Sequence, residues 1–133
     1  MTAEAAAPPA TAEPVLIVDD EKNIRRTLRM VLESEGYAVH EAGSAAEAES
    51  VLAREVVELI LLDVKLGDDN GLDLLRRVTA EAPQWLAGGG ILLVESSERQ
   101  APVAVETVAD AGLVPRLAVS EELNSTVVIG TRP

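Results

Sequence analysis

The chain has no cysteine and no phenylalanine among its 133 residues, and only one tyrosine, one tryptophan and one histidine. Without cysteine, neither disulfide bonds nor thiolate metal ligands can support the fold or the chemistry, which fits a reducing cytoplasmic setting. The single histidine, His40, has no second histidine or nucleophile near it in the sequence with which to build a catalytic triad. The apolar fraction is 47%, so we expect a core that is almost entirely aliphatic.

Basic residues are also scarce. There are 11 Lys and Arg against 23 Asp and Glu, which gives a formal net charge of −12. Such a chain is repelled by nucleic acids and by anionic membranes, so we expect neither as a direct partner. No apolar stretch has the length of a membrane span, and the N-terminal residues lack the pattern of a signal peptide.

The length suits one compact domain. Residues 1–14 are mostly Ala, Pro, Thr and Glu without apolar periodicity, which predicts a disordered leader. We expect a folded domain over residues 15–123 and a tail or irregular last element over residues 124–133.

Apolar runs alternate with helical patterns along the domain. The runs predict strands at residues 15–18, 37–41, 56–62, 91–94 and 116–119, with helices between them. Ser44 and Glu47 form a capping box at the start of the second helix. Residues 85–90, which include three consecutive glycines, are expected to be a loop, and residues 120–123 look like a helix start. The alternation predicts an α/β fold of three layers with a doubly wound, parallel, five-stranded sheet.

Acidic residues follow two of the buried runs directly. Asp19 and Asp20 come after the first run, and Asp63 comes after the third. In a parallel sheet the carboxyl ends of the strands meet at one edge, where ligands bind. Carboxylates crowded at such an edge repel one another unless a hard cation lies among them. The alternative is that Asp19 and Asp20 are only a turn and a helix start.

Three segments carry a resemblance to a known family. The segments VLIVDDE at residues 15–21, LILLDVK at 59–65 and GLDLL at 71–75 closely resemble the receiver domain of two-component response regulators. The resemblance implies a flavodoxin-like (CheY-like) sheet with strand order 2-1-3-4-5. It is strong up to about residue 78 and weak from there to about residue 123.

The resemblance also implies a role for each matching residue. Asp63 would accept a phosphoryl group from a histidine kinase or a histidine phosphotransfer protein. Asp19, Asp20 and Asp63, together with the backbone carbonyl of Lys65, would hold Mg²⁺, an ion that prefers a few carboxylates plus waters and substrate oxygens. The ion would neutralise charge on the transferred group.

Two departures from the family pattern lie in the second half of the chain. Where the family has a Ser or Thr after the fourth strand, counting from Ile91 places Glu95, whose carboxylate would repel a phosphoryl group. Ser96 or Ser97 could supply the hydroxyl instead, and counting back from Gly112 favours Ser97. The family also has a Lys after the fifth strand, whereas this sequence has no Lys after Lys65.

Two functions follow, and the sequence favours the first. The chain is either a Mg-dependent phosphorylated receiver that switches binding to a downstream protein, or a degenerate receiver that acts as an interaction or dimerisation module without phosphorylation. In the first case its only chemistry is its own phosphorylation and dephosphorylation, so we do not expect an enzyme. A hydrolase with an Asp nucleophile is disfavoured because Asp63-Val64-Lys65 lacks a second Asp. Whether residues after Gly112 pair between the subunits of a homodimer stays open.

Overall fold

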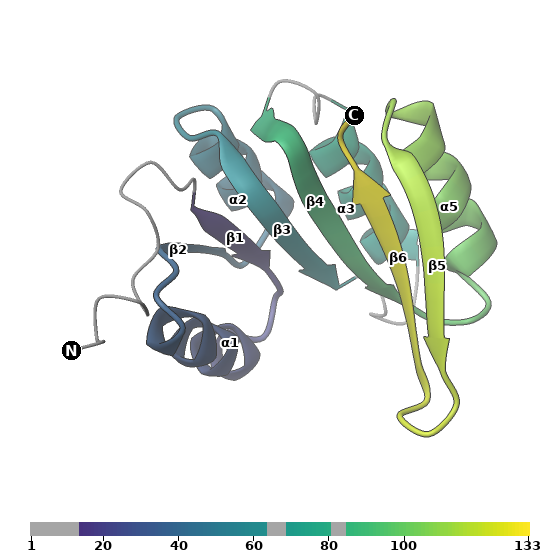
Figure 1. Cartoon of the computed structure of the whole chain (residues 1–133), viewed down its shortest axis with the longest axis horizontal. Helices are drawn as coiled ribbons and strands as arrows, with labels where there is room; N and C mark the ends of the chain where they lie inside the picture. Colours follow the sequence, from purple (N-terminus) through teal and green to yellow (C-terminus); the bar gives the residue numbers. More distant parts are fainter. Residues whose placement is uncertain (1–13, 64–68, 81–84) are drawn as a thin grey trace.

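The computed structural model describes residues 14–63, 69–80 and 85–133. Strands and helices alternate over the first three quarters of the chain, and two consecutive strands end it (Figure 1). The strands are β1 (Val15–Val18), β2 (Val39–Ala42), β3 (Val57–Asp63), β4 (Leu86–Ser96), β5 (Val114–Ser120) and β6 (Ser125–Thr131). The helices are α1 (Lys22–Ser34), α2 (Ala45–Leu52), α3 (Asp69–Thr79) and α5 (Ala101–Asp110).

The α/β fold class with a doubly wound sheet is confirmed, but the strand count and the order at one edge differ from expectation. The sheet has six strands in the order β2-β1-β3-β4-β6-β5. The first four strands in that order are parallel, as expected, while β6 runs antiparallel to both β4 and β5. Instead of lying directly beside β4, the fifth strand is therefore separated from it by β6.

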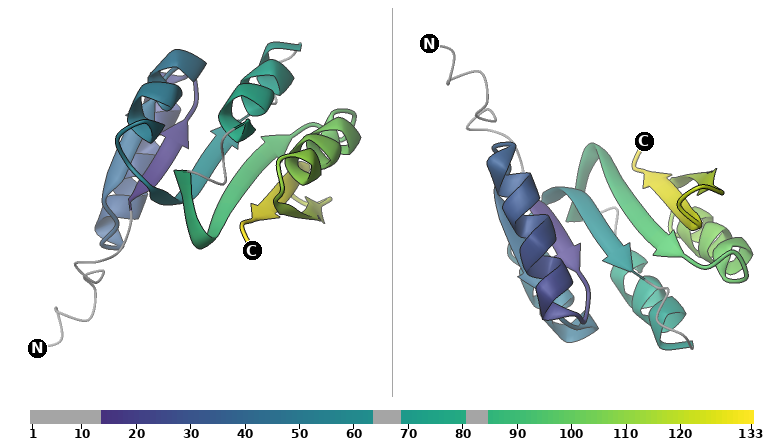
Figure 2. Two further views of the ribbon diagram at one scale, coloured as in Figure 1. Left: turned by 90° about the horizontal axis from the view of Figure 1, so that it is seen from above. Right: turned by 90° about the horizontal axis from the view of Figure 1, so that it is seen from below.

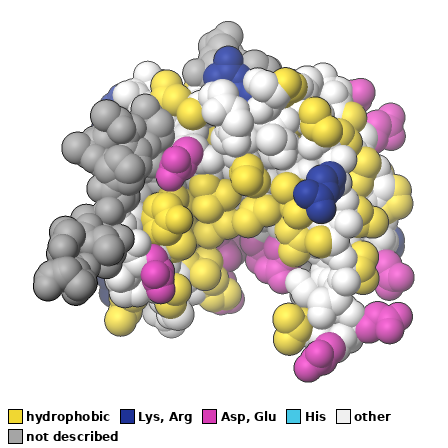
Figure 3. All heavy atoms as spheres, in the orientation of Figure 1, with side chains coloured by type: hydrophobic (Ala, Val, Ile, Leu, Met, Phe, Trp, Pro, Cys, Tyr) yellow, Lys and Arg dark blue, Asp and Glu magenta, His cyan; other side chains and the backbone are white. Residues whose placement is uncertain are grey.

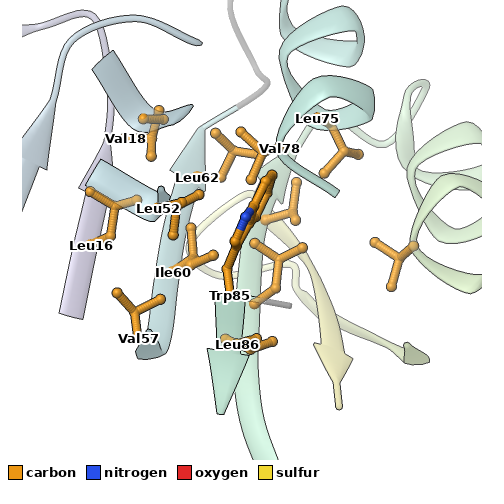
Figure 4. Packing of buried hydrophobic residues seen from close by; sticks show 14 of the residues in the cluster. Leu16, Val18, Leu52, Val57, Ile60, Leu62, Leu75, Val78, Trp85 and Leu86 are labelled. Carbon is orange, nitrogen blue, oxygen red and sulfur yellow. The ribbon is translucent and has the colours of Figure 1, made fainter. Parts of the chain in front are cut away.

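The helices divide unequally between the two faces of the sheet. Helices α2, α3 and α5 cover one face, and α1 lies on the other face over β1 and β2 (Figures 1 and 2). The main core lies under the three helices, where Ile60, Leu75, Val94 and Val128 are fully buried. Trp85 joins this cluster (Figure 4) and is 8% exposed. A smaller cluster of Val15, Ile17 and Val39 packs under α1.

The expected loop at residues 85–90 is wrong, because β4 begins at Leu86. Leu86 pairs with Val57, and the next pair is Ile91 with Leu59, so the glycines form a bulge in the strand. The amide of Gly89 donates to the carbonyl of Arg132 at 3.0 Å, and the amide of Arg132 donates to Gly90 at 3.0 Å. These bonds to the end of the chain hold the glycine segment in the sheet.

The expected helix start at residues 120–123 and the irregular tail are also wrong. Residues 121–124 make the turn of a β-hairpin, in which Asn124 has a φ of 49°. Residues 125–131 alternate between partly exposed and buried positions and form β6. The β-branched run Thr126 to Ile129 has the composition of a strand, and pairing with two neighbours outweighs a short helix signal.

Candidate functional site

Two of the acidic residues picked out in the sequence meet at the carboxyl edge of the sheet. Strands β1 and β3 are parallel neighbours, and Val18 lies opposite Leu62 in the register. The residues that follow them therefore lie side by side, with Asp63 as the last residue of β3 and Asp19 directly after the end of β1. The amide of Asp19 also donates to the carbonyl of Ala42 at 3.1 Å, which fixes the end of β1 to β2.

Asp19 and Asp63 line one pocket of about 260 Å³, and Glu95 of β4 lines it with them. Glu95 lies opposite Asp63 in the parallel register of β3 and β4. The other described lining residues are apolar: Ile17, Val18, Ile24, Leu28, Leu61, Leu62, Leu93 and Val127. Three carboxylates thus share a pocket whose described walls contain no Lys or Arg.

Asp19 is the most buried of these acids, at 6% exposure. Burial raises the pKa of its carboxyl group above the ordinary value of 3.8, and the negative charges of Asp63, Asp20 and Glu21 raise it further. The amide of Glu21 donates to Asp19 Oδ1 at 2.8 Å, which lowers the same pKa. On balance the pKa is raised, so this site disfavours the ionised form in the absence of a cation.

Arg25 of α1 connects the ends of β1 and β2 beside the pocket. Its guanidinium donates from Nη1 to the backbone carbonyl of Asp19 at 2.7 Å and from Nε to Glu41 Oε1 at 3.3 Å. Arg29 donates to the other oxygen of Glu41 at 3.0 Å. Arg25 thus holds the loop that carries Asp19, and its guanidinium binds Glu41 and a backbone carbonyl.

The donor set of the pocket suits a hard divalent cation. Asp19 and Asp63 offer carboxylate oxygens, and a cation between them would relieve the repulsion that adds to the effect of burial in raising the pKa of Asp19. Among the described residues, however, no three His, Cys, Asp or Glu side chains are close enough to enclose an ion by themselves. Asp20 is exposed, and Lys65 lies outside the described residues. The arrangement fits a divalent cation that retains several waters and needs few carboxylates.

The two serines proposed as switch hydroxyls lie apart from Asp63. Ser96 is 1% exposed on the sheet face opposite to Glu95, and its hydroxyl donates to the carbonyl of Ser97 at 3.0 Å. Ser97 Oγ accepts from the amide of Gln100 at 3.1 Å, where it helps to start α5. Both serines line a second, polar pocket with Ser120 and Thr126. The structure does not bring them to the acidic pocket, whereas it does bring Glu95 there.

Sequence reasoning missed the apolar half of this pocket. Val127 of β6 lies opposite Glu95 and lines the pocket, on the side of β4 where the family pattern requires a lysine-bearing strand. Ile24 and Leu28 of α1 form another wall. The β-branched run at 126–129 was the available signal for β6, but nothing in the sequence indicated that this strand would insert beside β4.

Comparison with known families identifies the class of the chain. A family model described as the response regulator receiver domain matches residues 15–117, which is most of the domain and ends within β5. The chain therefore belongs to the response regulator receiver domain family of two-component signalling. Strand β6 lies beyond the matched residues.

A curated relative supports the same assignment. The chain is 44% identical over 97 residues to the alginate biosynthesis transcriptional regulatory protein AlgB of Pseudomonas putida, which covers 73% of this chain and 20% of that protein. The chain thus spans about a fifth of the length of this relative.

Two solved structures are similar to this chain in different ways. A response regulator from Burkholderia pseudomallei with a phosphorylated aspartic acid, calcium ion and citrate is 32% identical, with a TM-score of 0.60 over 71% of this chain and 55% of that one. A protein-(glutamine-N5) methyltransferase from Alicyclobacillus acidocaldarius is 17% identical, with a TM-score of 0.69 over 96% of this chain and 85% of that one. The second likeness concerns the fold alone.

No helix in the described segments is long and apolar enough to cross a membrane.

Proposed function

We propose that this receiver domain accepts a phosphoryl group on Asp63 with the help of Mg²⁺ and thereby switches its binding to a downstream protein. The observation that supports the proposal most is the placement of Asp19 and Asp63 in one pocket at the ends of adjacent strands. The solved relative with a phosphorylated aspartic acid and a calcium ion adds support from within the family.

The chemistry requires little of the protein beyond position and charge. A carboxylate oxygen of Asp63 attacks the phosphorus of a phosphohistidine in line, the P–O bond forms, and the P–N bond breaks as the histidine leaves. The leaving imidazole takes a proton from solvent. When bound, Mg²⁺ supplies positive charge to the phosphoryl oxygens, and Asp19, Asp20, Asp63 and the carbonyl of Lys65 are the groups that would hold it.

The chain's own residues prepare this reaction. Arg25 and the Glu21 amide fix the backbone and the carboxylate of Asp19, so that one ligand is positioned in advance. The apolar residues Leu61, Leu62 and Leu93 exclude water from one side of the pocket, which strengthens the electrostatic interactions within it.

The second candidate is a degenerate receiver, and Glu95 is the observation that favours it. A third carboxylate lies opposite Asp63 and lines the same pocket, and its negative charge opposes the arrival of a phosphoryl dianion. In this case the domain would act as an interaction or dimerisation module through a surface that needs no phosphorylation. The two candidates differ in what acetyl phosphate does to the protein.

The test is intact-mass spectrometry after incubation with Mg²⁺ and acetyl phosphate, together with NMR titration with Mg²⁺ and beryllofluoride. We expect the mass of one phosphoryl group on the wild type and none on Asp63→Asn. Asp110→Asn, which changes an exposed carboxylate on α5, is the matched control and should behave as wild type. An unmodified wild type with unchanged spectra would favour the degenerate receiver.

The partners proposed here follow from the class of domain. A histidine kinase or phosphotransfer protein in the cytoplasm would supply the phosphoryl group. The AlgB relative is named as a transcriptional regulatory protein. We propose only that the surface of this chain itself does not bind nucleic acid, because its net charge is −12. We further propose that residues 15–131 form one domain, since β6 lies within the sheet.

A further inference from the structure

The backbone on both sides of Asp19 is bonded to neighbouring elements. Its amide donates to the carbonyl of Ala42 at the end of β2 at 3.1 Å, and its own carbonyl accepts from Arg25 Nη1 of α1 at 2.7 Å. Both peptide units that flank the Cα atom of Asp19 are therefore fixed. Since the allowed side-chain rotamers depend on the backbone angles, these bonds limit where the Asp19 carboxylate can point.

Arg25 is itself held by Glu41 of β2, a residue that does not line the acidic pocket. Arg25 Nε donates to Glu41 Oε1 at 3.3 Å, and Arg29 Nη1 donates to Glu41 Oε2 at 3.0 Å. The side chains of Arg25 and Glu41 are 16% and 20% exposed, so salt screens this pair less than a fully exposed one. The hydrogen bond from Arg29, and in addition the contacts of Arg25, lower the pKa of Glu41 below its ordinary value of 4.5, so Glu41 is ionised at neutral pH.

Gly43 allows the Arg25 side chain to lie close to the end of β2. A Cβ atom at Gly43 would come within 3.0 Å of Arg25 Nη1 and 3.3 Å of Glu47 Oε1. Glu47 Oε1 also accepts from the Gly43 amide at 2.6 Å, as part of the capping box of α2. The Arg25 guanidinium is thus packed between the Asp19 carbonyl and the turn from β2 to α2, with little freedom to move.

These contacts form a chain from Glu41 through Arg25 to the backbone of Asp19. The carboxylate at its end lines the acidic pocket, and the amide of Glu21 donates to its Oδ1 at 2.8 Å. Groups that orient a metal ligand without touching the metal change metal affinity roughly 10- to 100-fold when they are removed. Arg25 and Glu41 stand in this relation to a carboxylate of the proposed cation site.

We propose that Arg25 and Glu41 are positioning residues that set the affinity of the acidic pocket for a divalent cation by holding the backbone of Asp19. This role rests on the cation site of the proposed function, but it does not depend on phosphorylation of Asp63. Neither Arg25 nor Glu41 is a ligand, and both act on the cation through Asp19.

Charge alone predicts the opposite effect at Arg25. The chain has 11 Lys and Arg against 23 Asp and Glu, and in Figure 3 the Lys and Arg side chains are few and scattered over the face shown. Arg25→Gln removes one positive charge, and by long-range electrostatics it should strengthen the binding of a cation. If Arg25 positions Asp19, the same substitution should weaken that binding. The sign of the change therefore separates the two effects.

The test is a titration of the full chain with Mg²⁺, followed by the amide signals of residues 19–21 in NMR spectra. Arg25→Gln should raise the dissociation constant about tenfold. Before any Mg²⁺ is added, the Glu21 amide signal should also move upfield in this variant, because its hydrogen bond to Asp19 weakens. Arg26→Gln removes the same charge from an exposed neighbour on α1 and should bind Mg²⁺ at least as tightly as wild type. Circular dichroism checks the fold of each variant.

A double-substitution cycle tests whether Glu41 acts through Arg25. Glu41→Ala alone should weaken Mg²⁺ binding about threefold, less than Arg25→Gln does, because Arg25 keeps its bond to the Asp19 carbonyl. In the Arg25→Gln background the same substitution should have no further effect, because the link to Asp19 is already broken. Glu33→Ala is the control: it removes an equal charge that binds Arg29 on the surface of α1, and it should leave the affinity unchanged.

Three results would overturn the proposal. Binding of Mg²⁺ by Arg25→Gln that equals or exceeds that of wild type would show that charge, and not position, dominates. Equal effects of Glu41→Ala in the two backgrounds would show that Glu41 does not act through Arg25. A wild type that binds no Mg²⁺ would remove the site itself.

Phosphorylation of Asp63 is measured separately, by mass, so the two proposals can fail independently. A wild type that is phosphorylated, and whose Mg²⁺ affinity does not depend on Arg25, keeps the proposed function and overturns the positioning role. A wild type that is not phosphorylated, but whose Mg²⁺ affinity falls in Arg25→Gln, supports the positioning role and overturns the proposed function.

Discussion

Glu95 on β4 lies directly opposite Asp63 on β3, so the residue at the end of the fourth strand presents a carboxylate to the proposed acceptor. Neighbouring strands are about 4.8 Å apart, so the two side chains lie close enough for their charges to interact. Asp19 lines the same pocket. The charge of Glu95 therefore adds to the barrier for an incoming phosphoryl group rather than reducing it.

Replacing Glu95 with Thr should accelerate phosphorylation of Asp63 by acetyl phosphate. Two unit charges about 6 Å apart at an effective dielectric constant of about 40 interact by about 1.4 kcal/mol, so we expect a gain of about tenfold in rate. Intact-mass measurements over time provide the rate. Glu98→Thr, an exposed acid three residues further along, is the control and should leave the rate unchanged. Equal rates for Glu95→Thr and wild type would show that Glu95 does not govern the reaction.

Asp19 should make stability depend on pH. Its pKa is raised in the folded protein, first by burial, so the folded state holds this proton more strongly than the unfolded state does. Stability should therefore fall as pH rises from the unfolded value of about 3.8 through the folded pKa. Asp19→Asn cannot ionise and retains an acceptor for the Glu21 amide, so it should be more stable than wild type at pH 7.

Urea unfolding at pH 3 and pH 7 in the presence of a chelator measures this difference. At pH 3 the two proteins should be similar, because Asp19 is then protonated in both states. Asp110→Asn on the surface of α5 should show no such pH-dependent gain. Should Asp19→Asn prove less stable than wild type at pH 7, the raised pKa would be the wrong description of this carboxyl.

The acidic site could be predicted because short buried strands leave few alternatives. The apolar run from Val15 to Val18 and the run from Leu59 to Leu62 each continue into an Asp, and parallel pairing brings equivalent positions together. The placement of the serines could not be predicted in the same way. Successive residues of a strand point to opposite faces, so Ser96 lies on the helix side while Glu95 lies on the opposite side.

The C-terminal third was harder to predict because its strand order depends on pairing distant in the sequence. The run from Thr126 to Ile129 has strand propensity, but propensity does not say which neighbour a strand pairs with. Gly88 to Gly90 were predicted as a loop, since glycine usually breaks strands, yet the end of the chain at Arg132 bonds to them. Tertiary pairing decided both cases.

The capping box predicted at the start of α2 is present, and its contribution to the free energy of unfolding should be measurable. Ser44 Oγ accepts from the Glu47 amide at 3.2 Å, and Glu47 Oε1 accepts from the Gly43 amide at 2.6 Å. Ser44→Ala should lower the free energy of unfolding by about 1 kcal/mol, the usual cost of losing an N-cap. Ser50→Ala, at an exposed position later in the same helix, should have little effect in the same urea experiment. Equal losses for both variants would mean that Ser44 contributes nothing specific as a cap.

The insertion of β6 beside β4 leads to a last prediction about packing. Gly130 on β6 lies under α5, where an added Cβ would come within 2.7 Å of Val108 Cγ1 and 3.2 Å of Leu113 Cδ1. Both neighbours are buried, at 0% and 3% exposure, so neither can move away freely. Gly130→Ala should therefore lower the free energy of unfolding by about 1–3 kcal/mol, the usual cost of overpacking a core.

Gly88→Ala is the matched control for this prediction, because a Cβ at Gly88 meets nothing within 4 Å and the residue also lies in a strand. It should change stability much less than Gly130→Ala in the same urea titration. If β5 instead lay beside β4, with β6 outside the sheet, residue 130 would not face α5 and the two substitutions would cost about the same. The difference between these two glycines therefore measures whether the antiparallel strand occupies its place in the sheet.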